Sequence, residues 1–141
     1  MMQPRVDLIS LGVRSVDASR SFYVDGLGWR VLREAPGEVV FLQANHGLVL
    51  SLWDASRMRA EAGTSGPDGV PCITLSHNLG SAAEVDAVMA EARAAGASLV
   101  AAPKTQPWGG YTGYFADPDG FRWEVAFNPT WAVGADGTVM L

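Results

Sequence analysis

The chain has 141 residues and 48% of them are hydrophobic, which is enough for one globular domain or for two small repeats that share a core. The net charge is −5, the basic residues are scattered, and no apolar run approaches the roughly 20 residues of a membrane-spanning helix, so we expect neither a nucleic-acid nor a membrane partner. No apolar signal segment opens the sequence and the lone Cys72 cannot form an internal disulfide, so we expect a cytoplasmic protein.

The first part of the chain, residues 1–62, predicts one module of a strand, a helix and three strands, followed by a short helix. Ser15 or Asp17 can cap the first helix, and Gly26 ends it. The expected elements are a strand at 8–13, the capped helix, strands at 29–33, 39–44 and 48–53, and a short helix at 54–62.

Residues 63–71, rich in Gly, Ser and Pro, predict a linker, after which the pattern starts again. The second helix begins at a capping box from Ser81 to Glu84 and ends before Gly96. The expected elements of this second module, residues 72–129, are a strand at 72–77, the helix, and strands at 97–102, 111–116 and 121–127. Residues 130–141 predict a terminal hairpin tail around a Gly-Ala-Asp-Gly turn.

Short local matches support a duplication. Ile9-Ser10-Leu11 matches Ile73-Thr74-Leu75 at an offset of 64 (73 minus 9), and Gly47-Leu48 matches Gly120-Phe121 at an offset of 73 (120 minus 47). We therefore predict an α+β fold of two βαβββ modules that form an incomplete barrel, in which the helix-free sheet faces curl around a central cavity suited to a small molecule.

The last two strands of the second module form a hairpin that presents Glu124. Asp117, Pro118 and Gly120 are the residues of a tight turn. After this turn, alternation places Trp123 on the core face and Glu124 on the opposite face. Glu124 is then either a solvated residue paired with Arg122 or a partly desolvated carboxylate that acts as a base or binds a ligand.

Several segments resemble the vicinal oxygen chelate superfamily of glyoxalase I, bleomycin-resistance proteins, fosfomycin-resistance transferases and extradiol dioxygenases. The resemblance covers residues 6–129 and is most specific at residues 117–125. Residues 108–115 and 127–129 resemble a glyoxalase-like subgroup of unassigned function. The resemblance implies the same paired-module fold and a homodimer.

Metal-using members of this superfamily place their ligands at positions that correspond here to Leu8, Ser51, Cys72 and Glu124. Leu8 cannot donate, Ser51 is a weak ligand and Cys72 would have to lose its proton, so we predict no tightly bound catalytic metal and leave a weakly held divalent ion open. Neither histidine completes a site: His46 lies in a turn, and alternation turns His77 away from the cavity.

The candidate site combines the possible base Glu124 with aromatic and small polar neighbours. Trp108 and Tyr111 flank a glycine pair and could form a lid. The full set of predicted ligand-binding residues is Ser51, Trp53, Cys72, Thr74, Trp108, Tyr111, Arg122 and Glu124.

Three functions are compatible with these residues. The first is a protein that binds or sequesters a small organic ligand, as bleomycin-resistance proteins do. The second is a glyoxalase-like lyase or isomerase in which Glu124 moves a proton beside a carbonyl, with or without a weakly held divalent metal. The third is a subunit whose cavity is vestigial and whose surface binds another protein.

Overall fold

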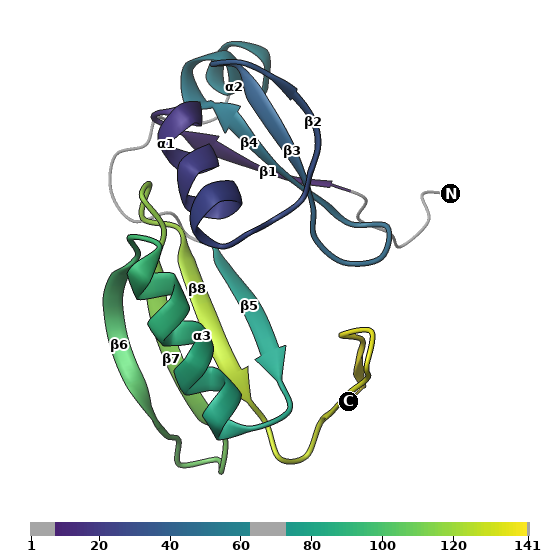
Figure 1. Ribbon diagram of the computed structural model, residues 1–141, viewed down its shortest axis with the longest axis vertical. Coiled ribbons are helices and arrows are strands. Elements are labelled where there is room, and N and C mark those ends of the chain that lie inside the picture. Colours follow the sequence, from purple (N-terminus) through teal and green to yellow (C-terminus); the bar gives the residue numbers. More distant parts are fainter. Residues whose placement is uncertain (1–7, 63–72, 141) are drawn as a thin grey trace. The chain divides into compact units, whose positions relative to one another are not determined.

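The computed structural model describes residues 8–62 and 73–140 (Figure 1). The chain divides into two compact units, Met1–Gly69 and Val70–Leu141. Each unit contains a four-stranded mixed sheet with a helix on one face, so the predicted α+β class and the two βαβββ modules are confirmed. No helix in the described ranges is long and apolar enough to cross a membrane.

The first unit contains a sheet in the order β1-β4-β3-β2, with β1 parallel to β4 and the other neighbours antiparallel. Ser15 is the residue that caps α1, because its hydroxyl accepts a hydrogen bond from Ala18 N at 3.1 Å. The elements are β1 (Leu8–Val13), α1 (Val16–Arg20), the π-helical turns η1 (Ser21–Gly26), β2 (Val31–Ala35), β3 (Val39–Gln43), β4 (Val49–Asp54) and α2 (Ala55–Ala62).

Strand β2 begins two residues later than the sequence predicts. Trp29 N donates to Tyr23 O at 2.9 Å, and the Trp29 ring packs edge-on against Tyr23 at 5.5 Å. Trp29 therefore belongs to the end of the helical segment, where aromatic contacts determine its conformation in place of strand pairing.

Helices pack on both faces of the first sheet, although the sequence predicts one face free of helices. Leu11, Val40 and Leu52 are buried on the face that α1 covers. On the opposite face, a Cβ added to Gly12 would come within 2.9 Å of Met58 Sδ and 3.6 Å of Ala55, so α2 packs there against the sheet. Glycine at position 12 allows this close approach.

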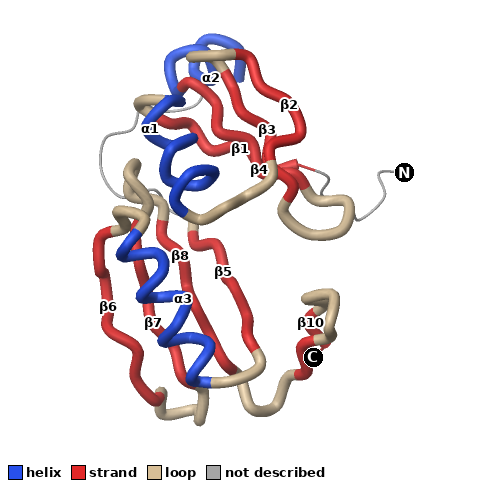
Figure 2. The backbone as a smooth tube through the Cα atoms, in the orientation of Figure 1, coloured by secondary structure: helices blue, strands red, loops and turns tan. Residues whose placement is uncertain are grey.

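The second unit repeats the arrangement in the order β5-β8-β7-β6 (Figure 2), with β5 parallel to β8. The predicted capping box is present: Glu84 N donates to Ser81 Oγ at 3.3 Å, and Ser81 Oγ donates to Glu84 Oε2 at 3.0 Å. The elements are β5 (Thr74–Leu79), α3 (Ala82–Ala94), β6 (Ser98–Thr105), β7 (Tyr111–Ala116), β8 (Arg122–Phe127), β9 (Ala132–Val133) and β10 (Val139–Met140).

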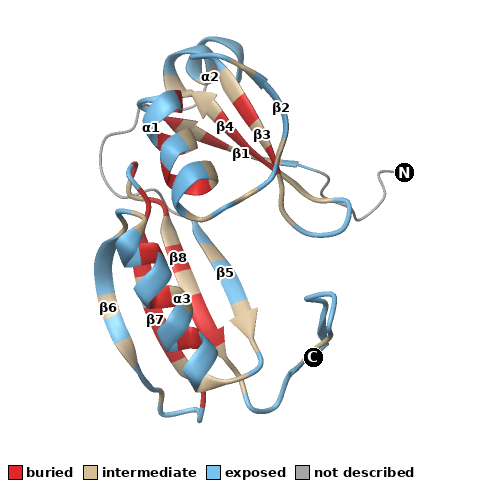
Figure 3. Cartoon of the chain, viewed as in Figure 1, coloured by how far each residue is buried: buried red, intermediate tan, exposed pale blue. Residues whose placement is uncertain are grey.

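Helix α3 covers one face of this sheet, and the core lies beneath it (Figure 3). Val85 and Met89 on α3 are buried, as are Phe115 and Val125 on the strands. The predicted tail hairpin exists as β9 paired with β10. The face opposite α3, called here the open face, carries Ser76, Glu124 and Tyr114.

Strand registers refine the predicted duplication. Tyr114 pairs with Glu124 as Phe41 pairs with Ser51, which gives the offset of 73 again (114 minus 41, and 124 minus 51). Ser76 pairs with Glu124 as Ser10 pairs with Ser51, which gives 66 (76 minus 10) and not the 64 taken from the local match. Thr74, and not Cys72, is therefore the counterpart of Leu8.

Candidate functional site

The turn before β8 fixes the position of Glu124. Asp117 is buried, and its Oδ1 accepts hydrogen bonds from Asp119 N and Phe121 N, both at 2.9 Å. Gly120 has φ +87°, a left-handed conformation that favours glycine, and its N–H donates to Asp117 O at 3.0 Å. The predicted tight turn is thus present, and the Asp117 side chain caps two of its N–H groups.

Glu124 lies in a polar row that crosses three neighbouring strands. Ser76 on β5 and Tyr114 on β7 are its register partners on either side. Ser76 Oγ donates to Glu124 Oε2 at 3.1 Å. Burial raises the pKa of Tyr114 above its ordinary value, and the neighbouring carboxylate of Glu124 raises this pKa further, so the phenol stays protonated.

A pocket of about 510 Å³ opens above this row on the open face. Glu124 is the charged residue of its lining, and the indoles of Trp108 and Trp131 contribute the large apolar surfaces. The complete lining in the described chain is Ser76, Asn78, Trp108, Glu124, Ala126, Asn128 and Trp131.

Trp108 is held in the loop between β6 and β7 by hydrogen bonds and by a contact with Gly110. Gln106 N donates to Gly110 O at 2.7 Å, and Gln106 Nε2 donates to Thr112 Oγ1 at 2.7 Å. The Trp108 ring lies directly over Gly110, so that any Cβ at Gly110 would collide with it. The predicted pair of flexible glycines is therefore a platform that positions one indole.

Trp131 enters the pocket from the tail. Asn128 Oδ1 accepts from Thr130 N at 3.0 Å and from Thr130 Oγ1 at 2.8 Å, and Trp131 N donates to Asn128 O at 3.1 Å. This compact turn directly follows β8, so it brings Trp131 back to the pocket that β8 lines.

Tyr111 and Arg122 are among the predicted site residues that do not line this pocket. Tyr111 lies on the α3 side of the sheet, where its hydroxyl donates to Asp86 Oδ1 at 2.8 Å. Tyr114, which belongs to the open face, is an odd number of residues further along β7. Because side chains alternate between the two faces of a strand, Tyr111 lies on the α3 side. Arg122 turns back along the chain and donates from Nη1 to Gly120 O at 3.1 Å, so the alternative pairing of Arg122 with Glu124 is wrong.

The remaining predicted residues lie elsewhere. Ser51 and Trp53 belong to β4 in the first unit, on the face opposite α1, where Ser51 is only 2% exposed. Thr74 is the exposed first residue of β5 and pairs with Arg122. Cys72 lies outside the described residues.

The described residues do not fit a resident catalytic metal of the kind that the superfamily uses. Around Glu124 the nearby donors are hydroxyls, and its counterpart in the first unit is Ser51. Across residues 8–62 and 73–140, no three His, Cys, Asp or Glu side chains gather closely enough to hold an ion. A catalytic zinc typically takes three protein ligands, which this donor set does not supply.

The other features of the second unit are structural. His77 lies on the α3 side, as predicted: partial burial lowers the pKa of its imidazole, and Glu91 on α3 opposes that shift.

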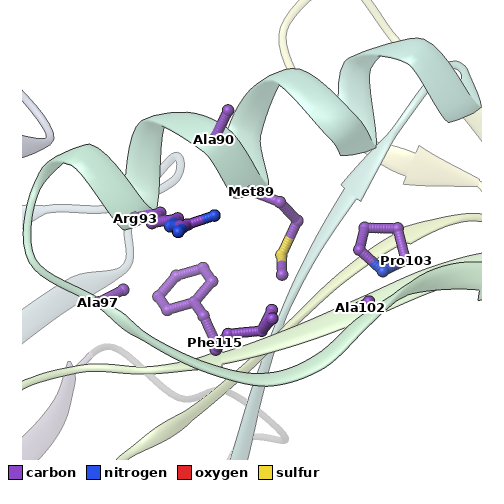
Figure 4. Close-up of a pocket in the computed structure, with 8 residues that line it drawn as sticks. Met89, Ala90, Arg93, Ala97, Ala102, Pro103 and Phe115 are labelled. Carbon is purple, nitrogen blue, oxygen red and sulfur yellow. The ribbon is translucent and has the colours of Figure 1, made fainter.

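A second pocket of about 180 Å³ lies between α3 and β6 (Figure 4), lined by apolar side chains and by Arg93. Phe115, at its base, stacks on Trp123 at 6.2 Å. Polar groups do not converge there, so it is a packing gap.

The sequence analysis missed Tyr114, Asn78, Asn128 and the contribution of Trp131 to the pocket. The hairpin register contained the signal for Tyr114, because it is as far before the turn as Glu124 is after it. Trp131 carried no such signal, since nothing in the sequence relates the tail to a particular strand face.

The fold and site together define a class: a glyoxalase-type α+β protein of two βαβββ modules with a carboxylate on the open face of the second sheet. The chain belongs to the Glyoxalase/Bleomycin resistance protein/Dioxygenase superfamily, whose family model matches residues 5–125. The predicted resemblance is thereby confirmed.

Solved structures support this assignment. A glyoxalase-related enzyme from Fulvimarina pelagi is 38% identical, covers 99% of both chains and has a TM-score of 0.89. A glyoxalase/bleomycin resistance protein/dioxygenase from Nocardioides is 26% identical over 100% of this chain and 91% of its own, with a TM-score of 0.74. A lactoylglutathione lyase from Agrobacterium tumefaciens is 25% identical over 93% and 98%, with a TM-score of 0.71. No curated protein matches the sequence.

Proposed function

We propose that this glyoxalase-related protein binds a small organic molecule in the pocket above Glu124 and needs no resident metal to do so. The observation that carries the proposal is the carboxylate of Glu124, which accepts a hydrogen bond from Ser76 in a pocket that Trp108 and Trp131 also line. A pocket of about 510 Å³ with extensive apolar walls and a few placed polar groups is typical of small-molecule sites.

The surroundings of Glu124 favour an anchoring role over proton abstraction. Ser76 Oγ donates to this carboxylate, so it uses one of the lone pairs that a general base would present to its substrate. A lyase would also have to stabilise the negative charge that develops on its substrate. Arg122, the neighbouring cation on the same strand, is turned toward Gly120 O and does not line the pocket.

The test combines metal analysis with binding. Protein purified without chelator is analysed for zinc, nickel and iron, and quenching of tryptophan fluorescence by benzyl alcohol is measured before and after dialysis against EDTA. We expect substoichiometric metal, quenching that EDTA leaves unchanged, and loss of most quenching in a Trp108→Ala, Trp131→Ala double variant.

A lactoylglutathione lyase assay, with and without added zinc or nickel, is run in parallel. Stoichiometric metal together with turnover that EDTA abolishes and Glu124→Gln removes would establish the lyase alternative instead. Benzyl alcohol quenching that is unaffected by the double variant would show that the pocket is not the binding site.

A further inference from the structure

No cationic side chain of the described residues neutralises the negative charge in the pocket. Among the described residues, no ion pair joins a cationic side chain to Glu124, and the cation two residues away on its strand is held by the backbone of the turn. The hydrogen bond that Glu124 accepts from Ser76 comes from a neutral hydroxyl. The carboxylate therefore presents a net negative charge to whatever occupies the pocket.

Two indoles line the same pocket as this charged side chain. Trp108 and Trp131 are 57% and 38% exposed, and both line the pocket that contains Glu124. Large exposed aromatic side chains beside a pocket mark a binding surface. The face of an indole is also the best aromatic partner for a positive charge, because of its negative electrostatic potential.

Each indole is positioned by its own local structure. Trp108 rests on Gly110, and Trp131 follows the turn that Asn128 stabilises. Orienting a ring before the ligand arrives lowers the entropic cost of binding. Two ordered aromatic surfaces that share a pocket with a carboxylate lacking a cationic partner among the described residues therefore select for positive charge and for a flat apolar group together.

We infer that the ligand is an organic cation, with an ammonium-like group directed at Glu124 and a planar apolar part against Trp108 and Trp131. This inference rests on the proposed function and specifies the class of ligand for the same pocket. A neutral ligand would leave the charge of Glu124 without a partner, and an anion would be repelled by it.

The experiment uses the full chain and three probes that differ mainly in charge: benzyltrimethylammonium, benzyl alcohol and benzoate. Affinities are measured by tryptophan fluorescence and by saturation-transfer NMR at low salt. We expect benzyltrimethylammonium to bind at least about tenfold more tightly than benzyl alcohol, and benzoate to bind most weakly. Raising the salt concentration should weaken the binding of benzyltrimethylammonium selectively, because dissolved ions screen the partly exposed charge of Glu124.

Variants separate the charge from the aromatic surfaces. Glu124→Gln abolishes the preference for benzyltrimethylammonium over benzyl alcohol, whereas Glu61→Gln, which removes one exposed carboxylate from α2, leaves all three affinities unchanged. Trp108→Leu weakens the binding of benzyltrimethylammonium more than Trp108→Phe does, because leucine keeps apolar area but has no π face.

The outcomes distinguish this inference from the proposed function. Equal affinities for the three probes, with binding that still depends on Trp108 and Trp131, overturn the cation assignment and leave the binding function intact. Absence of binding for all three probes, or binding insensitive to both tryptophans, overturns both.

Discussion

The two units share one sheet topology, but the segments that follow their last strands make them different. In the first unit β4 continues directly into α2, which packs on the face opposite α1 at Gly12. In the second unit β8 is followed by the Asn128 turn, and the corresponding face stays open as a pocket. The position equivalent to Gly12 is Asn78, which lines that pocket.

The row of side chains that contains Ser51 in the first sheet is also less polar than the row that contains Glu124 in the second sheet. The first unit has Ser10, Ser51 and Phe41 where the second has Ser76, Glu124 and Tyr114. With a hydroxyl in place of the carboxylate and a phenyl ring in place of the phenol, the row in the first unit carries no charge. The comparison indicates that the second sheet keeps a charged pocket because the segment after β8 leaves this face uncovered and β8 supplies a carboxylate.

The largest effect on stability is expected at the turn of the last hairpin, which differs between the two units. Asp117→Ala leaves two buried N–H groups without their acceptor and should lower the free energy of unfolding by about 2–4 kcal/mol, measured by urea denaturation. In the first unit Ala44 is the equivalent residue, and its N–H donates to Leu48 O at 3.1 Å. Asn45→Ala in that turn is the control and should cost less than about 1 kcal/mol. Equal costs would show that the two turns do not differ energetically.

Gly12→Asn gives the first unit the residue found at the corresponding position of the second. The new side chain must displace Met58 and Ala55 of α2, so we expect a loss of about 1–3 kcal/mol in urea denaturation. Combining it with Met58→Ala provides room and should restore part of the loss. If Gly12→Asn were neutral, the close packing of α2 on β1 would not stabilise the unit.

Gly110→Ala tests whether the glycine platform positions Trp108. The added methyl group collides with the indole, and Gly110 does not have a positive φ, so the substitution moves the ring with little backbone strain. We expect binding of benzyltrimethylammonium to weaken about as much as in Trp108→Ala, with a stability change below about 1 kcal/mol. In the Trp108→Ala background, Gly110→Ala should have no further effect on binding; an additive effect would contradict the positioning role.

Tyr114→Phe copies Phe41 of the first unit and removes the hydroxyl from a register partner of Glu124. Because Ser76 still donates to the carboxylate and Tyr114 does not line the pocket, benzyltrimethylammonium should bind within about threefold of its original affinity. Stability measured by urea denaturation should change by about 1 kcal/mol or less. A tenfold loss of affinity would assign Tyr114 a direct contact with the ligand.

The smallest effect concerns His77. Burial lowers its pKa in the folded state, so the unfolded chain binds the proton more readily, and stability falls as the pH drops below the ordinary histidine value near 6.5. Above that value both states are neutral and the effect disappears. His77→Asn should remove this part of the pH dependence, as measured by thermal unfolding at several pH values between about 5 and 8. An unchanged pH profile in the variant would assign the dependence to other groups.

Sequence patterns predicted most of the fold because the physical signals were local. Capping residues such as Ser15 and Ser81 and the Asp117 turn act over three or four residues, and alternation needs only a single strand. Errors arose where a long-range contact intervened. Trp29 contacts Tyr23 and therefore does not join the strand predicted for it. The offset between the first strands of the two modules could be determined only from their pairing with β4 and β8.

The sequence by itself determined that Glu124 faces away from the core, because strand alternation follows from backbone geometry. It also determined that the chain is built from two related modules. Only the tertiary structure decided that α2 covers one face while the other unit keeps a pocket, that Arg122 turns away from Glu124, and that Trp131 returns to the site. These outcomes depend on contacts between segments that are distant in sequence or on the choice of one side-chain conformer, and no local pattern encodes them.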